Sequence, residues 1–128
     1  MIGNWLFYAI DEDEITEIKI KEGTVGIMDY AFSGCDNVTG TVVIPDTVKI
    51  IGQGAFANCT RVSEYYIPAS VTYMGHNVFA EWYLTDTDDQ DTSLVINCEA
   101  SAEPEEWNDN WIRYPYMGTN PCTINWGK

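Results

Sequence analysis

The chain has 128 residues, with 20 acidic residues against 6 basic ones and a formal net charge of -14. Its length is that of one domain, and its 45% hydrophobic content is that of a folded protein. The negative charge argues against a nucleic-acid partner, because the phosphates would be repelled. No run approaches the roughly 20 apolar residues of a membrane span, so no membrane insertion is expected.

The N-terminal segment, residues 1–17, is expected to cap one end of the fold. Residues 1–11 are rich in aromatic and aliphatic side chains and predict one strand, and the acidic run 11–14 predicts a solvated turn. The apolar stretch 5–10 lacks a basic region before it and a small-residue cleavage site after it. It is therefore a poor match to a signal peptide.

Three copies of one pattern follow, with Phe32, Phe56 and Phe79 at equivalent positions and steps of 24 and then 23 residues. A period of this size is typical of a solenoid of stacked coils. Each copy begins with alternating apolar and polar residues, which predict a strand with one buried face. The predicted strands of one parallel sheet are 17–20, 41–44, 64–67 and, for a fourth coil, 93–96.

This alignment assigns the strand residues to two faces. The inward columns are Ile18, Val42, Tyr65, Leu94 and Ile20, Ile44, Ile67, Ile96. The outward columns are Glu17, Thr41, Glu64, Ser93 and Lys19, Val43, Tyr66, Val95.

The second half of each copy is expected to return the chain across the core. Pro45 and Pro68 end their strands, because proline lacks the N–H that a ladder needs. A second extended stretch then follows, with inward residues Val48, Ile51, Val71 and Met74. Gly52 and Gly75 are expected at tight bends. Ala-Phe at 31–32 and 55–56 and Val-Phe at 78–79 predict short helical turns whose phenylalanines form the spine of the stack.

The shared motif Ile-Pro-x-[Ser/Thr]-Val-x-x-[Ile/Met]-Gly-x-x-[Ala/Val]-Phe-x-x-Cys resembles the BspA-like leucine-rich repeat. The match covers residues 18–82, and the tail from Ile96 to Gly127 is similar to the closing segment of that family. Departures are Thr24 and Met28 in the first copy and Trp82 with an acidic insertion in the third. The resemblance implies a short right-handed α/β solenoid, mainly β, of about four coils with a parallel sheet. Its expected parts are an N-terminal cap (1–17), repeats (18–96, with the insertion at 85–92) and a C-terminal cap (97–128).

The four cysteines do not fix the redox compartment. Cys35 and Cys59 occupy one repeat position, at which Trp82 stands in the third copy, so buried thiols are the favoured interpretation. Stacked coils also place their Cβ vectors parallel, whereas a disulfide needs them to converge. Whether Cys98 and Cys122 form a disulfide stays open.

The sequence offers little for catalysis, metals or cofactors. His76 is the single histidine, at a variable repeat position, and no partner for a catalytic dyad can be placed beside it. The adjacent acids Glu105 and Glu106 are not an opposed pair of the kind that glycoside hydrolysis uses. An acidic loop has the alternating oxygens that calcium favours, but it lacks the glycine and glutamate of an EF-hand, so a solvated insertion is the favoured interpretation. Its candidate ligands are Asp86, Asp88, Asp89 and Asp91. We expect no cofactor and no enzymatic activity.

Two groups of side chains are candidates for binding. The aromatic residues of the tail would stack on sugars if exposed, but packing within the cap is the favoured interpretation; they are Trp107, Trp111, Tyr114, Tyr116 and Trp126. On the outward sheet face, an apolar column is typical of a partner site. The alternative interpretations are ordinary β-propensity at exposed strand positions and cover by another chain. The candidate ligand-binding residues of this face are Thr41, Val43, Glu64, Tyr66 and Val95.

The resemblance implies a non-enzymatic recognition module of a secreted or surface protein. Adhesion or binding to a host or cell surface, through the outward sheet face, is the expected role, with an extracellular or cell-surface location. The acidity favours a protein partner with a neutral or basic surface. The alternative is a structural or decoration module of a larger assembly, such as a phage particle or surface layer, which would self-associate or dock on a scaffold.

Overall fold

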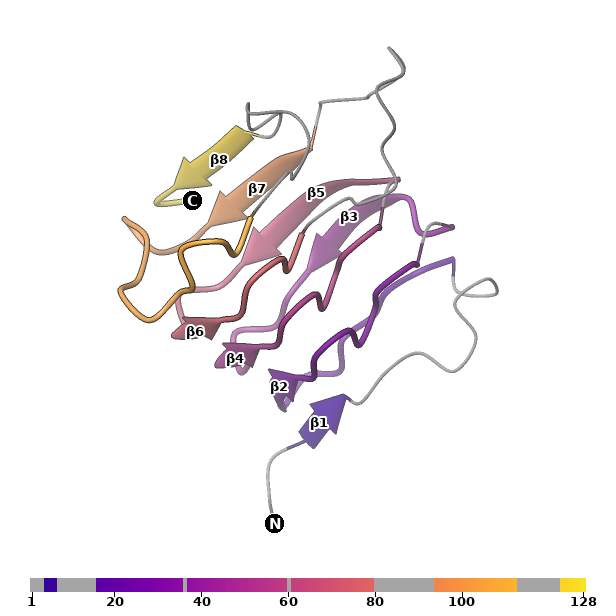
Figure 1. Ribbon diagram of the computed structural model, residues 1–128, viewed down its shortest axis with the longest axis horizontal. Helices are drawn as coiled ribbons and strands as arrows, with labels where there is room; N and C mark the ends of the chain where they lie inside the picture. Colours follow the sequence, from indigo (N-terminus) through magenta and orange to yellow (C-terminus); the bar gives the residue numbers. More distant parts are fainter. Residues whose placement is uncertain (1–3, 7–15, 36, 60, 80–93, 113–122) are drawn as a thin grey trace.

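The fold is a stack of coils with two parallel four-stranded sheets (Figure 1). The computed structural model describes residues 4–6, 16–35, 37–59, 61–79, 94–112 and 123–128. Sheet A has the order β1 (Asn4–Leu6), β2 (Thr24–Ile27), β4 (Ile50–Ile51) and β6 (Tyr73–Met74). Sheet B has the order β3 (Gly40–Val43), β5 (Val62–Ile67), β7 (Val95–Cys98) and β8 (Thr123–Trp126). Each strand pairs with a strand of a neighbouring coil.

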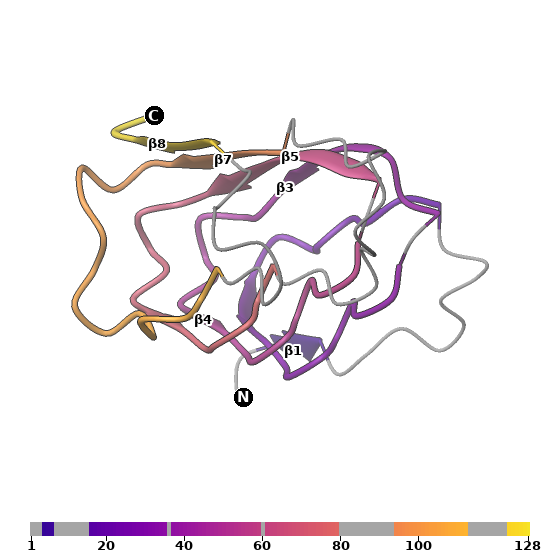
Figure 2. The same ribbon diagram turned by 45° about the horizontal axis from the view of Figure 1, so that its top comes forward.

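The coils are joined on a third side as well. Phe32 N donates to Ala55 O at 2.8 Å, and Phe56 N donates to Val78 O at 2.9 Å. Val78 N then donates to Trp111 O at 3.0 Å, which extends the ladder to the C-terminal segment. Figure 2 shows sheet B along one side of the coils and β1 and β4 along the opposite side. The predicted solenoid of stacked coils is confirmed, and three inter-coil ladders hold it together.

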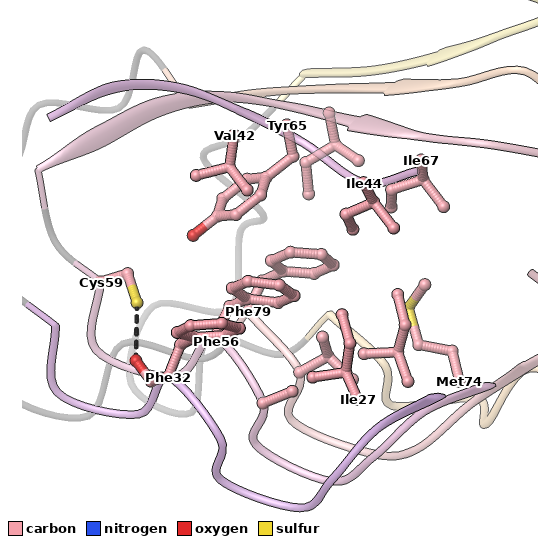
Figure 3. Packing of buried hydrophobic residues seen from close by; sticks show 14 of the residues in the cluster. Ile27, Phe32, Val42, Ile44, Phe56, Cys59, Tyr65, Ile67, Met74 and Phe79 are labelled. Atoms are coloured by element: carbon pink, nitrogen blue, oxygen red, sulfur yellow. Dashed lines mark hydrogen bonds between the residues drawn. The ribbon is translucent and has the colours of Figure 1, made fainter. Parts of the chain in front are cut away.

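A column of aromatic rings fills the space between the sheets (Figure 3). Phe32 and Phe56 stack with centroids 5.4 Å apart, and Phe56 and Phe79 stack at 5.7 Å. Tyr65 of β5 packs on Phe56 and Phe79 at 5.3 and 4.6 Å. The predicted spine is therefore confirmed. The inward residues of the second extended stretch are also buried, as predicted: Val48, Ile51, Val71 and Met74.

Hydroxyl groups after each proline link neighbouring coils. Thr47 Oγ1 accepts from Gly23 N at 3.2 Å and donates to Thr24 O at 2.8 Å. Ser70, at the equivalent position of the next coil, donates to Val48 O at 2.7 Å. The Ser/Thr position of the repeat motif thus satisfies backbone groups at the corner, where the sheet ladders are interrupted.

The repeat glycines have a different role from the predicted one. Gly52 and Gly75 lack a positive φ, so they do not mark tight bends that require glycine. A Cβ on Gly75 would lie 2.7 Å from Gln53 N, and one on Gly52 would lie 2.5 Å from Asp29 N. Glycine is therefore required at these positions because the preceding coil approaches closely.

The predicted helical turns are wrong for the part of the chain that the structure describes, which contains no helix. The Ala-Phe pairs begin hydrogen-bonded turns instead, for example with Cys35 N donating to Phe32 O at 3.2 Å. A residue in the left-handed region precedes each pair, with φ of 59° at Tyr30, 62° at Gly54 and 58° at Asn77. A right-handed helix cannot continue through a residue in this conformation.

Sheet B differs from the predicted sheet at both ends. Residues 17–20 form no strand, although Ile18 is buried and Lys19 is exposed as the alternation predicts. The fourth strand is β8, from the C-terminal segment, which pairs with β7 in parallel. The predicted N-terminal strand belongs to sheet A, in which β1 is the edge strand and pairs with β2.

Candidate functional site

The outward face of sheet B presents two large apolar side chains next to each other. Val43 of β3 and Tyr66 of β5 are partners in the parallel register, and their residues are 61% and 40% exposed. Their inward neighbours Val42 and Tyr65 are almost completely buried. The alternation thus places Val43 and Tyr66 on the solvent side, as the sequence predicted.

The prediction that Val95 continues the apolar column beside Tyr66 is wrong. Val95 lies opposite Glu64 and not Tyr66, because β7 is displaced by two residues from the predicted register. Asn97 is the residue that lies opposite Tyr66. A displacement by two keeps every side chain on its predicted face, so Val95 remains outward but only half-buried. The exposed apolar surface is therefore a pair of side chains and not a column of three.

A chain of polar side chains crosses the same face. Asn97 Nδ2 donates to Glu64 Oε2 at 2.9 Å, and Asn125 Nδ2 donates to Asn97 Oδ1 at 3.0 Å. At the other end, Thr41 Oγ1 donates to Glu64 Oε1 at 3.5 Å. We call these four residues the polar ladder. Thr41 and Glu64, which were predicted to bind a ligand, are thus engaged with their neighbours in the sheet.

A pocket of about 340 Å³ opens at the carboxyl ends of β3, β5 and β7. Its apolar side chains come from the exposed pair and from the residues that follow it on each strand, and its polar side chains come from the corners of the coils. The lining residues are Glu22, Val43, Ile44, Pro45, Asp46, Tyr66, Ile67, Pro68, Asn97, Glu99 and Lys128. The pocket therefore extends the Val43–Tyr66 surface toward the prolines.

The charged side chains of this pocket are mostly acidic. Glu22 and Asp46 occupy the same position in successive coils, next to the Gly23–Thr47 hydrogen bond. Neither carboxylate has an ion pair with a cation of the described part of the chain. Glu99 Oε1 accepts from Ala69 N at 3.2 Å. Lys128 is the one basic residue in the lining.

Two of the tail tryptophans, Trp107 and Trp111, belong to the core, and the half-buried Trp126 packs against it. Trp107 and Trp111 are buried, and Trp111 packs on Phe79 with centroids 6.0 Å apart. Their indole N–H groups donate to Val71 O at 3.1 Å and to Glu103 Oε1 at 3.0 Å. These rings cover the last coil, as the cap interpretation predicted, and offer no surface for sugar stacking. Tyr114 and Tyr116 lie outside the described residues.

The cysteines are packing residues wherever the structure describes them. Cys35, Cys59 and Cys98 are buried, and Cys59 Sγ donates to Phe32 O at 3.1 Å (Figure 3). The hydrogen bond with Cys35, together with burial, raises the pKa of the Cys59 thiol well above its ordinary value. A protonated, buried thiol is a poor nucleophile. Cys122 lies outside the described residues.

The other candidates for chemistry do not assemble into a site. His76 and the adjacent acids Glu105 and Glu106 are exposed. Among the residues that the structure describes, no three His, Cys, Asp or Glu side chains lie close enough to hold a metal ion. The predicted calcium ligands Asp86, Asp88, Asp89 and Asp91 lie outside the described residues.

Comparison with known proteins identifies the repeats. The family model described as BspA type leucine-rich repeat region (6 copies) matches residues 1–100. Repeats of this type are typical of protein-binding surface proteins and are generally non-catalytic. No curated protein and no solved structure gave a significant match. In the described part of the chain, no helix is long and apolar enough to cross a membrane.

Proposed function

The chain belongs to the BspA-type leucine-rich repeat family, and we propose that it is a non-enzymatic module that binds another protein through the outer face of sheet B. Adhesion at an extracellular or cell surface is the role that this family membership favours. The observation that supports the site is the exposed pair Val43 and Tyr66, which lie side by side and line the pocket.

The packing of the rest of the chain makes this pair informative. Most large apolar side chains of the described residues are buried, and the exposed ones are Tyr30, Val43, Tyr66 and Tyr73. The Tyr30 hydroxyl accepts from Gln53 Nε2 at 2.9 Å, so part of that side chain is engaged within the fold. Val43 and Tyr66 are the two that adjoin each other and a hollow. Tyrosine in a partly desolvated hollow is a typical centre of a protein interface.

The charge of the chain constrains the partner. With a net charge of -14, an acidic partner would be repelled and a neutral or basic one attracted. The association rate constant for a basic partner should therefore fall as salt is added, because at 0.1 M salt the attraction between charges more than about 10 Å apart is largely screened.

The test compares two exposed tyrosines of similar accessibility on opposite sheets. Tyr66 is 40% exposed on sheet B, and Tyr73 is 46% exposed on sheet A. The immobilised chain would be used to isolate a partner from cell-surface extracts, and the purified partner would then be titrated against each variant. We expect Tyr66→Ser to weaken binding roughly tenfold or more, as an interface centre does, and Tyr73→Ser to leave it unchanged.

Each other outcome identifies a different site or role. Equal affinity of both variants for the partner would contradict the sheet B site. Loss of binding in Tyr73→Ser alone would place the site on sheet A. If the immobilised chain retains copies of itself, or components of one assembly, the alternative role as a structural or decoration module is correct. Sedimentation of the purified chain would then show self-association.

A further inference from the structure

We propose that the pocket at the carboxyl ends of β3, β5 and β7 receives an arginine side chain of the partner protein. This inference rests on the proposed function, because it assigns the chemistry of the contact that the same face would make. The pocket combines apolar walls, one exposed aromatic ring and carboxylates without a basic partner in the described part of the chain.

The size of the pocket fits one side chain. Its volume of about 340 Å³ is near the lower end of the roughly 300–1,000 Å³ that is usual for sites binding whole small molecules. Val43, Tyr66, Pro45 and Pro68 all line it. Apolar walls of this kind pack well against the methylene groups of a long side chain, and its charged end then reaches the polar rim.

The carboxylates give the pocket a preference for a cation. Glu22 and Asp46 occupy equivalent positions in adjacent coils, so their like charges repel each other unless a cation lies between them or beside them. Glu99 adds a third carboxylate, one oxygen of which is hydrogen-bonded to Ala69 N. Lys128 makes no ion pair with these acids in the described residues. The lining therefore has three acidic side chains against one lysine and is negative overall.

The arrangement favours an extended cation over a metal ion. The described acidic side chains do not come together in groups of three that could surround a metal. A guanidinium group is planar, has five N–H donors and can bind one carboxylate through two parallel hydrogen bonds. It also stacks on aromatic rings, and Tyr66 provides such a ring in the lining of the pocket. Lysine carries the same charge but lacks the planar geometry, so arginine fits the combination of ring and carboxylates better.

The experiment uses a blocked tripeptide, acetyl-Val-Arg-Val-amide, and the isotope-labelled chain observed by NMR. We expect its addition to shift the backbone amides of Val43, Asp46, Tyr66 and Asn97. The matched peptide with citrulline, a neutral analogue of arginine, should bind roughly tenfold more weakly or not at all, and the lysine peptide should be intermediate. The double variant Glu22→Gln/Asp46→Asn should weaken arginine-peptide binding roughly three- to tenfold, the effect of two exposed ion pairs.

The control variant is Glu106→Gln, which removes an exposed carboxylate outside the pocket and should leave binding unchanged. Equal binding of the arginine and citrulline peptides, shifts outside the pocket, or no shift at the highest soluble peptide concentration would overturn the inference. It would also be overturned if calcium chloride alone shifted the same amides and displaced the peptide, because the site would then bind a metal.

The same variants separate this inference from the proposed function. If the isolated partner loses affinity for Tyr66→Ser but not for Glu22→Gln/Asp46→Asn, the sheet B face is the binding site and the arginine contact is wrong. If the peptide binds the pocket but the partner is indifferent to both variants, the pocket accepts arginine, but this partner does not use it, and the proposed partner site and its arginine contact are both wrong.

Discussion

Asn97 Nδ2 donates to Glu64 Oε2 at 2.9 Å, which joins β7 to β5 by side chains on the outer face of sheet B. Asn97 is only 6% exposed and accepts a further bond from Asn125, so it holds the centre of the polar ladder. The side chain of Asn125 donates to Asn97, whereas Glu64 accepts from both Asn97 and Thr41. The polar ladder therefore orders the face on which Val43 and Tyr66 are displayed.

Replacing Asn97 should consequently destabilise the fold. Asn97→Ala removes two hydrogen bonds and leaves the partners of a buried amide unsatisfied, for which we expect a loss of about 1–3 kcal/mol in the free energy of unfolding. Asn125 is half-buried and makes one of these bonds, so Asn125→Ala should cost about 1 kcal/mol. Urea denaturation measures both values. Equal losses for the two variants would show that Asn97 is not the central residue.

The amino-acid sequence predicted the faces of sheet B better than its register. Alternation of apolar and polar residues defines which side chains point inward, but it is unchanged when a strand slides by two residues. The segment between Phe79 and Leu94 interrupts the 23-residue period, so the position of β7 could not be obtained by counting. Asn97 was therefore assigned to the cap, although it lies in the sheet beside Tyr66.

The pocket could not be predicted for a similar reason. The recurrence of Pro45 and Pro68, and of Glu22 and Asp46, was visible as a repeat spacing, and this was the available signal. The repeat spacing does not predict that Glu99 and Lys128 also line the pocket, because these two residues come from the segment after the repeats. Residues 17–20 show that a correct burial pattern does not by itself predict a strand. Their burial follows the predicted alternation, yet a strand also requires ladder hydrogen bonds with a neighbour.

The ring column predicts unequal effects for two equivalent phenylalanines. Phe56 contacts the rings of Phe32, Phe79 and Tyr65, whereas among the described residues Phe32 contacts the ring of Phe56 alone. Each ring pair contributes about 0.5–1.5 kcal/mol beyond area burial. We expect Phe56→Leu to lower the free energy of unfolding about two to three times as much as Phe32→Leu. Denaturation midpoints give the comparison, and a larger effect at Phe32 would contradict the central position of Phe56.

The close approach of the coils predicts which glycines tolerate a methyl group. A Cβ on Gly75 would meet two backbone atoms of Gln53 within 2.9 Å, and backbone atoms cannot rotate away. Gly40 has a φ of 81° but nothing within 4 Å of the added Cβ. Gly75→Ala should therefore cost more than about 2 kcal/mol, and Gly40→Ala about 1 kcal/mol. Thermal and urea denaturation would measure the difference, and the reverse order would rule out coil contact as the reason for Gly75.

The buried thiol of Cys59 predicts how stability changes in alkaline solution. Its hydrogen bond with Cys35 and its burial raise its pKa in the folded state, whereas in the unfolded chain the thiol titrates at its ordinary pKa, near 9.0. Above that pH the unfolded state loses a proton that the folded state keeps. The stabilisation from a group with a raised pKa is complete below the unfolded pKa and declines as the pH rises above it.

The free energy of unfolding should thus gain a slope of about -1.4 kcal/mol per pH unit above pH 9 from this one group. Other groups titrate in the same range, so the measurement is the difference between the native chain and Cys59→Val, each unfolded by urea at several pH values. The variant loses the hydrogen bond from the Cys59 thiol to Phe32 O, but that loss is independent of pH. Parallel stability curves for the two proteins would mean that Cys59 does not titrate differently in the folded and unfolded states.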